Sequence, residues 1–202
     1  MNPDDPRVQR TRDRLRAALR SLAAEHELRS LTIAAVAREA GVNRATVYQH
    51  YGDLDALVAD TMESAAAHVA RCADHCPLDR VRDRDASSGA GPSSADQVRD
   101  LPPEPLVDLF EHVAEHAVLY RRMLSEQGSA RFAHMLRDRL TEVLAARFAQ
   151  GARPPGFDDV PERLHAAYVA GALVGVVSDT VLAGGERTPE ATAAATWRLL
   201  RA

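Results

Sequence analysis

The chain has 202 residues, of which 4% are aromatic, and a formal net charge of −4. This length allows a small head and a larger second domain, the scarcity of aromatic residues favours closely packed helices, and the negative charge excludes a protein that coats nucleic acid over its whole surface. Residues 1–50 carry nine arginines and six acidic residues, whereas residues 51–202 carry sixteen arginines and twenty-three acidic residues. Phosphate attraction is therefore confined to the N-terminal end, unless the arginines cluster there by chance.

The first predicted helix spans residues 7–25, where leucine and alanine recur at helical spacing. We expect this apolar stripe to pack beneath the next two helices and to complete a three-helix head. The remaining surface of the helix carries four arginines, which are candidates either for phosphate contacts or for an ordinary solvated face: Arg10, Arg12, Arg14 and Arg16.

Residues 31–57, LTIAAVAREAGVNRATVYQHYGDLDAL, predict two short helices with a tight turn between them, followed by a longer helix. Thr32 and Asn43 stand where their side chains can cap the two short helices, and Gly41 stands where a helix end favours the left-handed conformation. The second short helix, residues 44–50, presents arginine, hydroxyl, aromatic and imidazole groups on one open face. Such a face suits a DNA major groove, and the alternative is an ordinary helical hairpin.

The run AREAGVNRATVYQHYGDLDALV resembles the DNA-binding domain of the TetR family of bacterial transcriptional regulators. The resemblance implies an all-α fold, in which an N-terminal helix-turn-helix domain (1–52) is joined to a larger helical domain for effector binding and dimerisation (53–202). One departure is Leu54, which stands where the family usually has a lysine that approaches the DNA backbone, so one phosphate contact is lost. The residues expected at the DNA are Thr32, Arg44, Ala45, Thr46, Tyr48, His50 and Tyr51.

A fourth helix is expected from the Asp53 cap to about Cys76, because Pro77 cannot continue it. The resemblance makes this helix the link between the head and the body. His68, Cys72 and Cys76 lie along one edge of the helix, so a metal site is an alternative to ordinary packing. Packing is the more common role for such residues on an alanine-rich helix, and no metal or other cofactor is expected.

Residues 78–105 are rich in Asp, Arg, Ser, Gly and Pro, and predict a mobile loop. Helical periodicity returns over residues 105–126 and again from residue 129 to about residue 150. The pair of His112 and His116 could bind a metal ion, with solvent exposure as the alternative. A ligand pocket is mostly apolar with a few polar groups, and the candidates for such a pocket are His116, Tyr120, Phe132, Met135 and Tyr168.

The last two predicted helices, residues 161–183 and 189–201, are rich in alanine, glycine and valine. Small residues let helix backbones approach closely, and a mostly apolar helix needs cover on several sides. The resemblance implies that the last helices of two subunits form a four-helix interface, so we expect a twofold homodimer. A buried core within one subunit is the alternative. The expected interface residues are Ala167, Gly171, Val174, Gly175 and Trp197.

The resemblance implies a repressor, whose two heads read an inverted repeat in double-stranded DNA and which an unknown small-molecule effector releases. The sequence leaves activation open as well. It contains no glycine-rich phosphate loop, no Gly-x-Ser-x-Gly and no His-Glu-x-x-His, so we expect no enzyme. A helical adaptor that has lost DNA binding is another alternative, because of Leu54. No apolar run reaches the roughly 20 residues of a membrane span, and the N-terminus lacks a hydrophobic signal segment, which predicts a cytoplasmic protein without a membrane partner.

Overall fold

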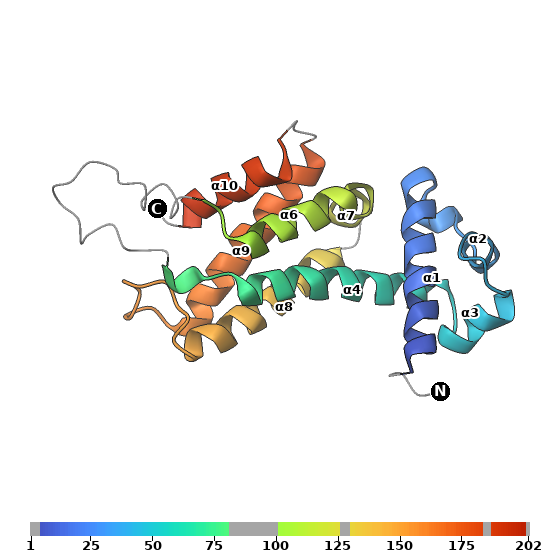
Figure 1. Ribbon diagram of the computed structural model, residues 1–202, viewed down its shortest axis with the longest axis horizontal. Coiled ribbons are helices and arrows are strands. Elements are labelled where there is room, and N and C mark those ends of the chain that lie inside the picture. Colours follow the sequence, from blue (N-terminus) through green and yellow to red (C-terminus); the bar gives the residue numbers. More distant parts are fainter. Residues whose placement is uncertain (1–4, 81–100, 126–129, 184–186, 201–202) are drawn as a thin grey trace. The chain divides into compact units, whose positions relative to one another are not determined.

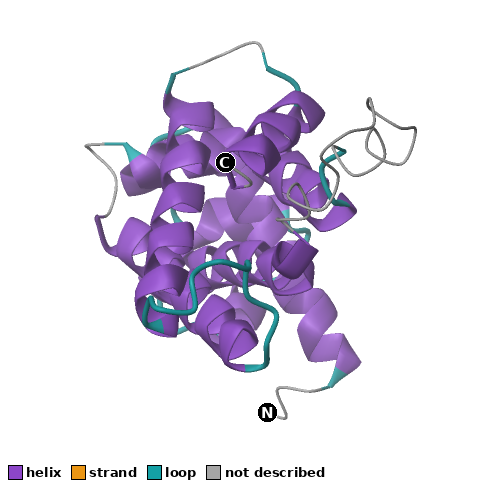
Figure 2. Ribbon diagram, turned by 90° about the vertical axis from the view of Figure 1, so that its left-hand side faces the viewer, coloured by secondary structure: helices purple, strands orange, loops and turns teal. Residues whose placement is uncertain are grey.

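The computed structural model describes residues 5–80, 101–125, 130–183 and 187–200. Within these ranges the chain forms helices, turns and loops and contains no strand (Figure 2). The predicted all-α fold is confirmed. The chain divides into two compact units, residues 1–65 and residues 66–202.

The first unit contains α1 (Pro6–Glu25), a short 3-10 turn η1 (Leu28–Ser30), α2 (Ile33–Glu39), α3 (Arg44–His50) and the start of α4 (Leu54–His75) (Figure 1). Helix α1 packs on α2, and α2 packs on α3. The predicted apolar stripe of α1 forms the centre of this unit together with one side of the following helices. Large side chains that are fully buried there include Leu15, Leu19, Val36, Val47 and Leu57.

The predicted caps of α2 and α3 and the predicted glycine turn between these helices are confirmed. The side chain of Thr32 accepts a hydrogen bond from the amide of Ala35 at 3.2 Å, and that of Asn43 accepts from the amide of Ala45 at 2.9 Å. Gly41 has a φ angle of 61°, a backbone conformation that residues other than glycine rarely adopt. Each cap satisfies an amide that has no partner within its own helix, which stabilises the helix by about 1 kcal/mol. The short α3 is thus held at its start by its own sequence.

The second unit contains the rest of α4, the 3-10 turn η2 (Leu78–Arg80), and five further helices. These are α6 (Glu104–Glu115), α7 (Ala117–Leu124), α8 (Ala130–Ala149), α9 (Glu162–Leu182) and α10 (Pro189–Leu200). Helix α9 packs along α8 and also contacts α7, while α10 packs on α6. Arg147 of α8 donates to the carbonyl oxygens of Ala73 and Cys76 at 3.0 and 2.5 Å, and so satisfies the C-terminal end of α4.

Two parts of the second unit differ from the prediction. The single helix expected over residues 105–126 is broken at His116, whose φ of −115° and ψ of 22° separate α6 from α7. Leu119, which was not expected on the inner face, is buried in α7. The expected loop over 78–105 is shorter at both ends, because Leu78 is buried in η2 and α6 begins at Glu104. Residues 81–100 of that prediction lie outside the described residues.

Helix α9 meets the length and composition expected of a membrane span. The core helix of a globular unit meets the same criterion, and one side of α9 is buried inside the second unit through Val169, Leu173 and Val177. The apolar character of α9 is therefore weak evidence for a membrane.

Candidate nucleic-acid interface

The open face of α3 carries most of the predicted DNA contacts. Arg44, Ala45 and Tyr48 are exposed, whereas Thr46 and His50 are half-buried. The guanidinium of Arg44 donates to the Tyr48 hydroxyl at 3.4 Å, and its central carbon lies 5.8 Å from the centre of the Tyr48 ring. This pairing over four residues is typical of neighbours on one helix face. The helix thus presents a cation and a phenol side by side to solvent.

Tyr51 was expected among the DNA contacts, and this prediction is wrong. Its side chain is only 4% exposed, and its hydroxyl donates to Oδ2 of Asp60 at 2.6 Å. The sequence held one signal for this placement, since Tyr51 follows the inward-facing Val47 by four residues and therefore lies on the same side of the chain. The aromatic ring that ends the motif supports the head from within.

Asp60 of α4 is the centre of a polar network that the sequence did not reveal. Arg16 of α1 donates to both of its carboxylate oxygens, at 2.6 and 3.1 Å, and Arg12 lies 4.0 Å away. Burial alone would raise the pKa of Asp60, but the hydrogen bonds from Arg16 and Tyr51 and the two arginine charges lower it. Burial, followed by the bond to Asp60, raises the pKa of Tyr51 to about 12. The network joins α1, the end of α3 and the start of α4.

Most of the arginines predicted on the surface of α1 make contacts within the first unit. Arg14 donates to the carbonyl oxygens of Ala40 and Gly41, at 2.6 and 3.2 Å, where a positive charge also complements the end of the α2 dipole. Arg16 binds Asp60, and Arg12 lies over the ring of Tyr51 at 5.4 Å. Of the four arginines considered from sequence, Arg10 and Arg14 are exposed. Because Arg14 binds the end of α2, Arg10 stays the candidate for phosphate contact.

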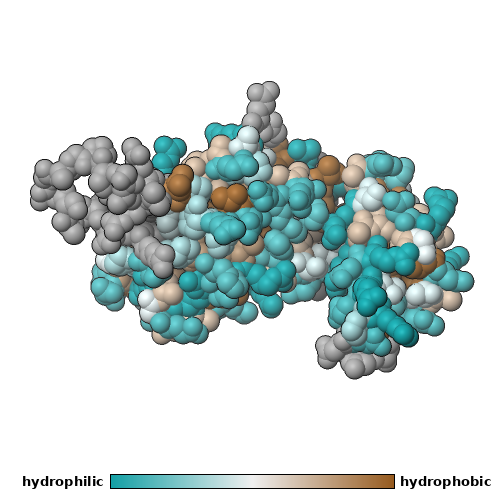
Figure 3. All heavy atoms as spheres, viewed as in Figure 1, coloured by the Kyte–Doolittle hydropathy of each residue, from teal (hydrophilic) through white to brown (hydrophobic). Residues whose placement is uncertain are grey.

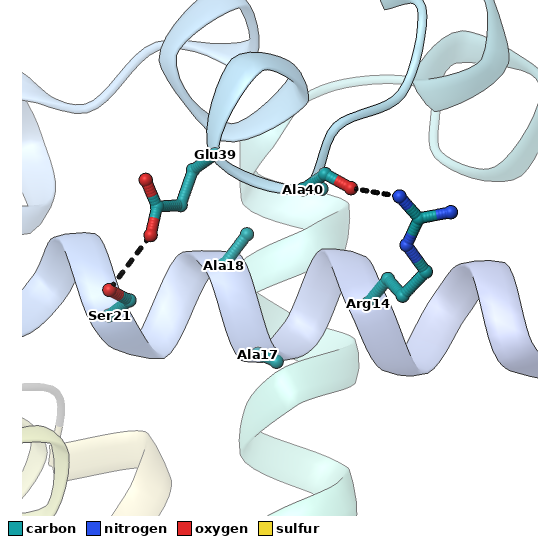
Figure 4. Close-up of a pocket in the computed structure, with 6 residues that line it drawn as sticks. All are labelled: Arg14, Ala17, Ala18, Ser21, Glu39 and Ala40. Atoms are coloured by element: carbon teal, nitrogen blue, oxygen red, sulfur yellow. Dashed lines mark hydrogen bonds between the residues drawn. The ribbon is translucent and has the colours of Figure 1, made fainter.

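A hollow of about 320 Å³ lies between α1 and the end of α2 (Figure 4). The Arg14 bond to Ala40 borders one end of it, and a 3.0 Å bond from the Ser21 hydroxyl to Glu39 borders the other. Ala17 and Ala18 of α1 also line it, and their methyl groups offer no polar contact to a ligand. The hollow is therefore a packing gap between two hydrogen bonds that link α1 to α2.

His50 ends α3 with its ring partly turned inward. Burial, and then the charge of Arg12, lower the pKa of His50, so the imidazole is neutral at neutral pH. Its Nδ1 atom is buried and has no hydrogen-bond partner within the part of the chain that the structure describes. A contact from His50 to DNA would therefore have to use Nε2.

In the second unit, two of the predicted pocket residues meet in the core. The buried rings of Tyr120 and Phe132 lie edge to face with their centres 5.9 Å apart, and burial raises the pKa of Tyr120. His116 and Met135 are half-buried. Tyr168 does not belong to this group, because it is 73% exposed on the outer side of α9. The prediction that Tyr168 lines the pocket is wrong.

The structure also does not bring His68, Cys72 and Cys76, the alternative metal site on α4, together as one group of ligands. Cys72 and Cys76 are buried, and burial raises the pKa of both thiols, that of Cys76 to about 12, so they remain protonated. The ring of His68 stacks instead on that of His112 of α6, with centres 3.9 Å apart. Among the described residues, the side chains close enough to share an ion are His112, Glu115 and His116.

The outer side of α9 carries the small residues that were expected at a dimer interface. Ala167, Gly171 and Val174 are half-buried and Gly175 is exposed, and a Cβ atom added at either glycine would meet nothing in the described part of the chain within 4 Å. Trp197 is 3% exposed and lies inside its own subunit, so its place in the expected interface is wrong. Several hydrophobic side chains reach the surface of this unit near α10 (Figure 3). The large exposed ones on α9 and α10 are Leu164, Tyr168, Leu182 and Leu199.

A capped recognition helix, a glycine turn before it and a supporting first helix define a helix-turn-helix DNA-binding domain. The sequence pattern of bacterial regulatory proteins of the tetR family matches residues 15–61, and that of a transcriptional regulator C-terminal region matches residues 101–201. The chain belongs to the TetR family of transcriptional regulators.

Solved structures share the fold at low sequence identity. The dihydroxyacetone kinase operon activator DhaS superposes with a TM-score of 0.67 at 13% identity, over 94% of this chain and 93% of its own. FadR from Bacillus subtilis, solved in complex with stearoyl-CoA, gives 0.59 at 14% identity, over 94% and 97%. A TetR-like regulator from Rhodococcus gives 0.54 at 21% identity, over 94% and 93%. The sequence matches no curated protein.

Proposed function

We propose that this regulator represses transcription by binding an inverted-repeat operator as a homodimer, and that a small-molecule effector releases it. The observation that carries the proposal is the exposed pair of Arg44 and Tyr48 on the capped α3. An arginine can bind guanine through two hydrogen bonds in the major groove, and the tyrosine holds it on the side of the helix that faces outward. Thr32, Ala45, Thr46 and His50 complete the proposed contact surface.

The test is a mobility shift of the full chain on its own upstream DNA across a salt series. We expect saturable binding to one inverted repeat with two or four chains bound. The double variant Arg44→Ala, Tyr48→Ala should lose on the order of 10- to 100-fold in affinity, since one bidentate base contact discriminates by about 1–3 kcal/mol. Arg187→Ala removes the same charge from an exposed site in the second unit and should bind like the wild type. Equal binding to all sequences, or none at low salt, would contradict the proposal and favour the adaptor.

The outer face of α9 supports the homodimer. Tyr168 is exposed there, and Gly171 and Gly175 have open space beside them, so a second copy could approach this backbone closely. Tyr168→Glu should shift the protein from dimer to monomer in analytical ultracentrifugation. Gln150→Glu, an equal charge on an exposed polar site at the end of α8, is the control. A monomeric wild type, or a Tyr168→Glu dimer as tight as the control, would contradict this interface.

Two aromatic side chains of the second unit support an effector site there. Tyr120 and Phe132 place rings in a mostly apolar core beside the half-buried His116 and Met135, a mixture that is common in ligand sites. FadR, which shares the fold, was solved with stearoyl-CoA, so a fold of this kind can hold an organic ligand in that protein. The effector should weaken operator binding by about 5- to 150-fold. DhaS is an operon activator of the same fold, so activation is the second candidate, and a promoter-reporter assay decides between them.

A further inference from the structure

Three side chains with metal-binding atoms gather where α6 ends. His112 and Glu115 stand on the last turn of α6, and His116 follows at the junction with α7. Their nearest ligand atoms all lie within 4.8 Å of one another. Residues three and four apart lie on the same side of a helix, so all three can point to one place. Two imidazoles and one carboxylate form a set that zinc and related ions accept.

The surroundings of this group favour an ion that enters from solvent. Glu115 is exposed, and the two histidines are half-buried, with their ring centres 4.6 Å apart and their planes nearly perpendicular. Ligands of a tetrahedral zinc ion are about 3.3 Å apart, which follows from metal–nitrogen bonds near 2.0 Å. A small rotation of the exposed Glu115 and of His116, whose backbone is not helical, is enough to close that difference.

We propose that His112, Glu115 and His116 bind a divalent transition-metal ion, for which Zn²⁺ is the reference. Three protein ligands leave a fourth position open, as in zinc sites that hold water or an exchangeable anion. The site thus differs from a closed structural site, and it can take either the free ion or an anionic ligand that the ion carries.

The contact between His112 and His68 connects this site to α4. The two rings stack at 3.9 Å with only 19° between their planes, a geometry in which their nitrogen lone pairs do not meet at one ion. His68 therefore supports the ring of His112 from the side of α4, the helix that runs on from the first unit. Metal binding would fix the His112 ring and so favour one position of α4.

The first test is a zinc titration of the full chain in competition with a chromophoric chelator, with Co²⁺ absorption to report the ligand geometry. We expect one ion per chain, and a loss of affinity of at least about tenfold in both Glu115→Gln and His116→Gln, because each removes a direct ligand. His134→Gln, at an exposed histidine of α8, and Cys72→Ala should bind like the wild type. Thermal unfolding without metal shows whether each variant is folded. Absence of binding at micromolar free zinc, or unchanged affinity in both ligand variants, would overturn the site.

The second test measures operator binding with and without zinc, and this part rests on the proposed function. Zinc should weaken operator binding of the wild type by about 5- to 150-fold. In His68→Ala the ion should still bind within about threefold of wild-type affinity, but its effect on the operator should be lost. Zinc binding without any effect on the wild-type operator complex would overturn the regulatory role. If the operator is not bound at any zinc concentration, the proposed function fails, while the zinc titration still decides the metal site.

Discussion

Replacement of Asp60 by asparagine tests whether the partly buried network around Asp60 stabilises the first unit. Asp60→Asn keeps the shape of the side chain but removes its charge, and it turns an amide toward the guanidinium of Arg16. Asp60 now accepts two hydrogen bonds from Arg16 and one from Tyr51. In the variant, one N–H group of Arg16 faces the amide nitrogen of asparagine, which is a donor and cannot accept a hydrogen bond.

The size of the effect follows from burial and from the number of bonds. Hydrogen bonds to charged groups contribute about 1.5–3 kcal/mol each, and breaking a fully buried pair costs about 3–5 kcal/mol. The side chains of Asp60 and Arg16 are 21% and 16% exposed, so solvent screens part of this interaction. We therefore expect a loss of about 2–3 kcal/mol in the free energy of unfolding. For a unit of this size, that is a fall in melting temperature on the order of 10 °C.

The assay has to observe the first unit separately. The chain has a single tryptophan, Trp197, and it lies in the second unit, so tryptophan fluorescence reports the unfolding of that unit. Far-UV circular dichroism reports the helices of both. Asp60→Asn should move the dichroism transition to lower urea and leave the fluorescence transition unchanged. The control is Asp13→Asn, which removes the exposed partner of the same Arg16 and should cost less than about 1 kcal/mol.

The pH dependence gives an independent check. Because the folded pKa of Asp60 lies below its ordinary value of 3.8, the network contributes fully above pH 3.8, and its contribution is lost as the pH falls through the lower folded pKa. The stabilities of the wild type and Asp60→Asn should therefore converge in acid. If Asp60→Asn is as mild as Asp13→Asn at neutral pH, or if the difference persists in strong acid, the reasoning is refuted.

Three further changes test single features. Gly41→Ala places a side chain at a positive φ and 3.1 Å from the guanidinium of Arg14, so urea unfolding should show a loss of about 1–2 kcal/mol in the free energy of unfolding. Its control is Ala34→Gly at an exposed position of α2, which should lose no more than about 1 kcal/mol. Leu54→Lys restores a cation at the start of α4 and should steepen the salt dependence of operator binding by about one unit in the log–log slope; an unchanged slope means that this position does not face phosphate. Arg147→Met leaves the last carbonyls of α4 without their donor and should lower the stability seen by tryptophan fluorescence by about 1–3 kcal/mol, a result that an unaltered transition would contradict.

The sequence correctly predicted local features, such as helix caps and turns, that depend on residues close together in the chain. Thr32 and Asn43 cap their helices because each side chain reaches an amide two or three residues ahead, and Gly41 adopts a positive φ because the helix ends there. The predicted bounds of the recognition helix, Arg44 to His50, are those of α3. Such features are encoded within a few residues, so one sequence is enough to find them.

The errors concern side chains whose burial depends on distant parts of the chain. Tyr51 is buried and its hydroxyl donates a hydrogen bond to Asp60, which in turn accepts hydrogen bonds from Arg16, 44 residues earlier in the chain. Trp197 and Tyr168 both stand on apolar helices, yet one is enclosed and the other is exposed. Composition gives both faces of α9 a similar character, so the side that faces the core could not be read from the sequence. The stacking of His68 on His112 joins two helices separated by residues 76–103, and no local sequence pattern predicts it.

The division of α4 between the two units has a consequence for synthesis on the ribosome. The hydrogen-bond partners of Asp60, Arg16 and Tyr51, both precede it in the sequence. The first unit can therefore fold once its own residues have emerged from the ribosome. The other end of the same helix must wait, because Arg147, which binds its last carbonyls, is made 71 to 74 residues later. The two ends of α4 are therefore stabilised at different times during translation. In a nascent chain that stops before α8, we expect the first unit to be folded while the C-terminal end of α4 still lacks its partner.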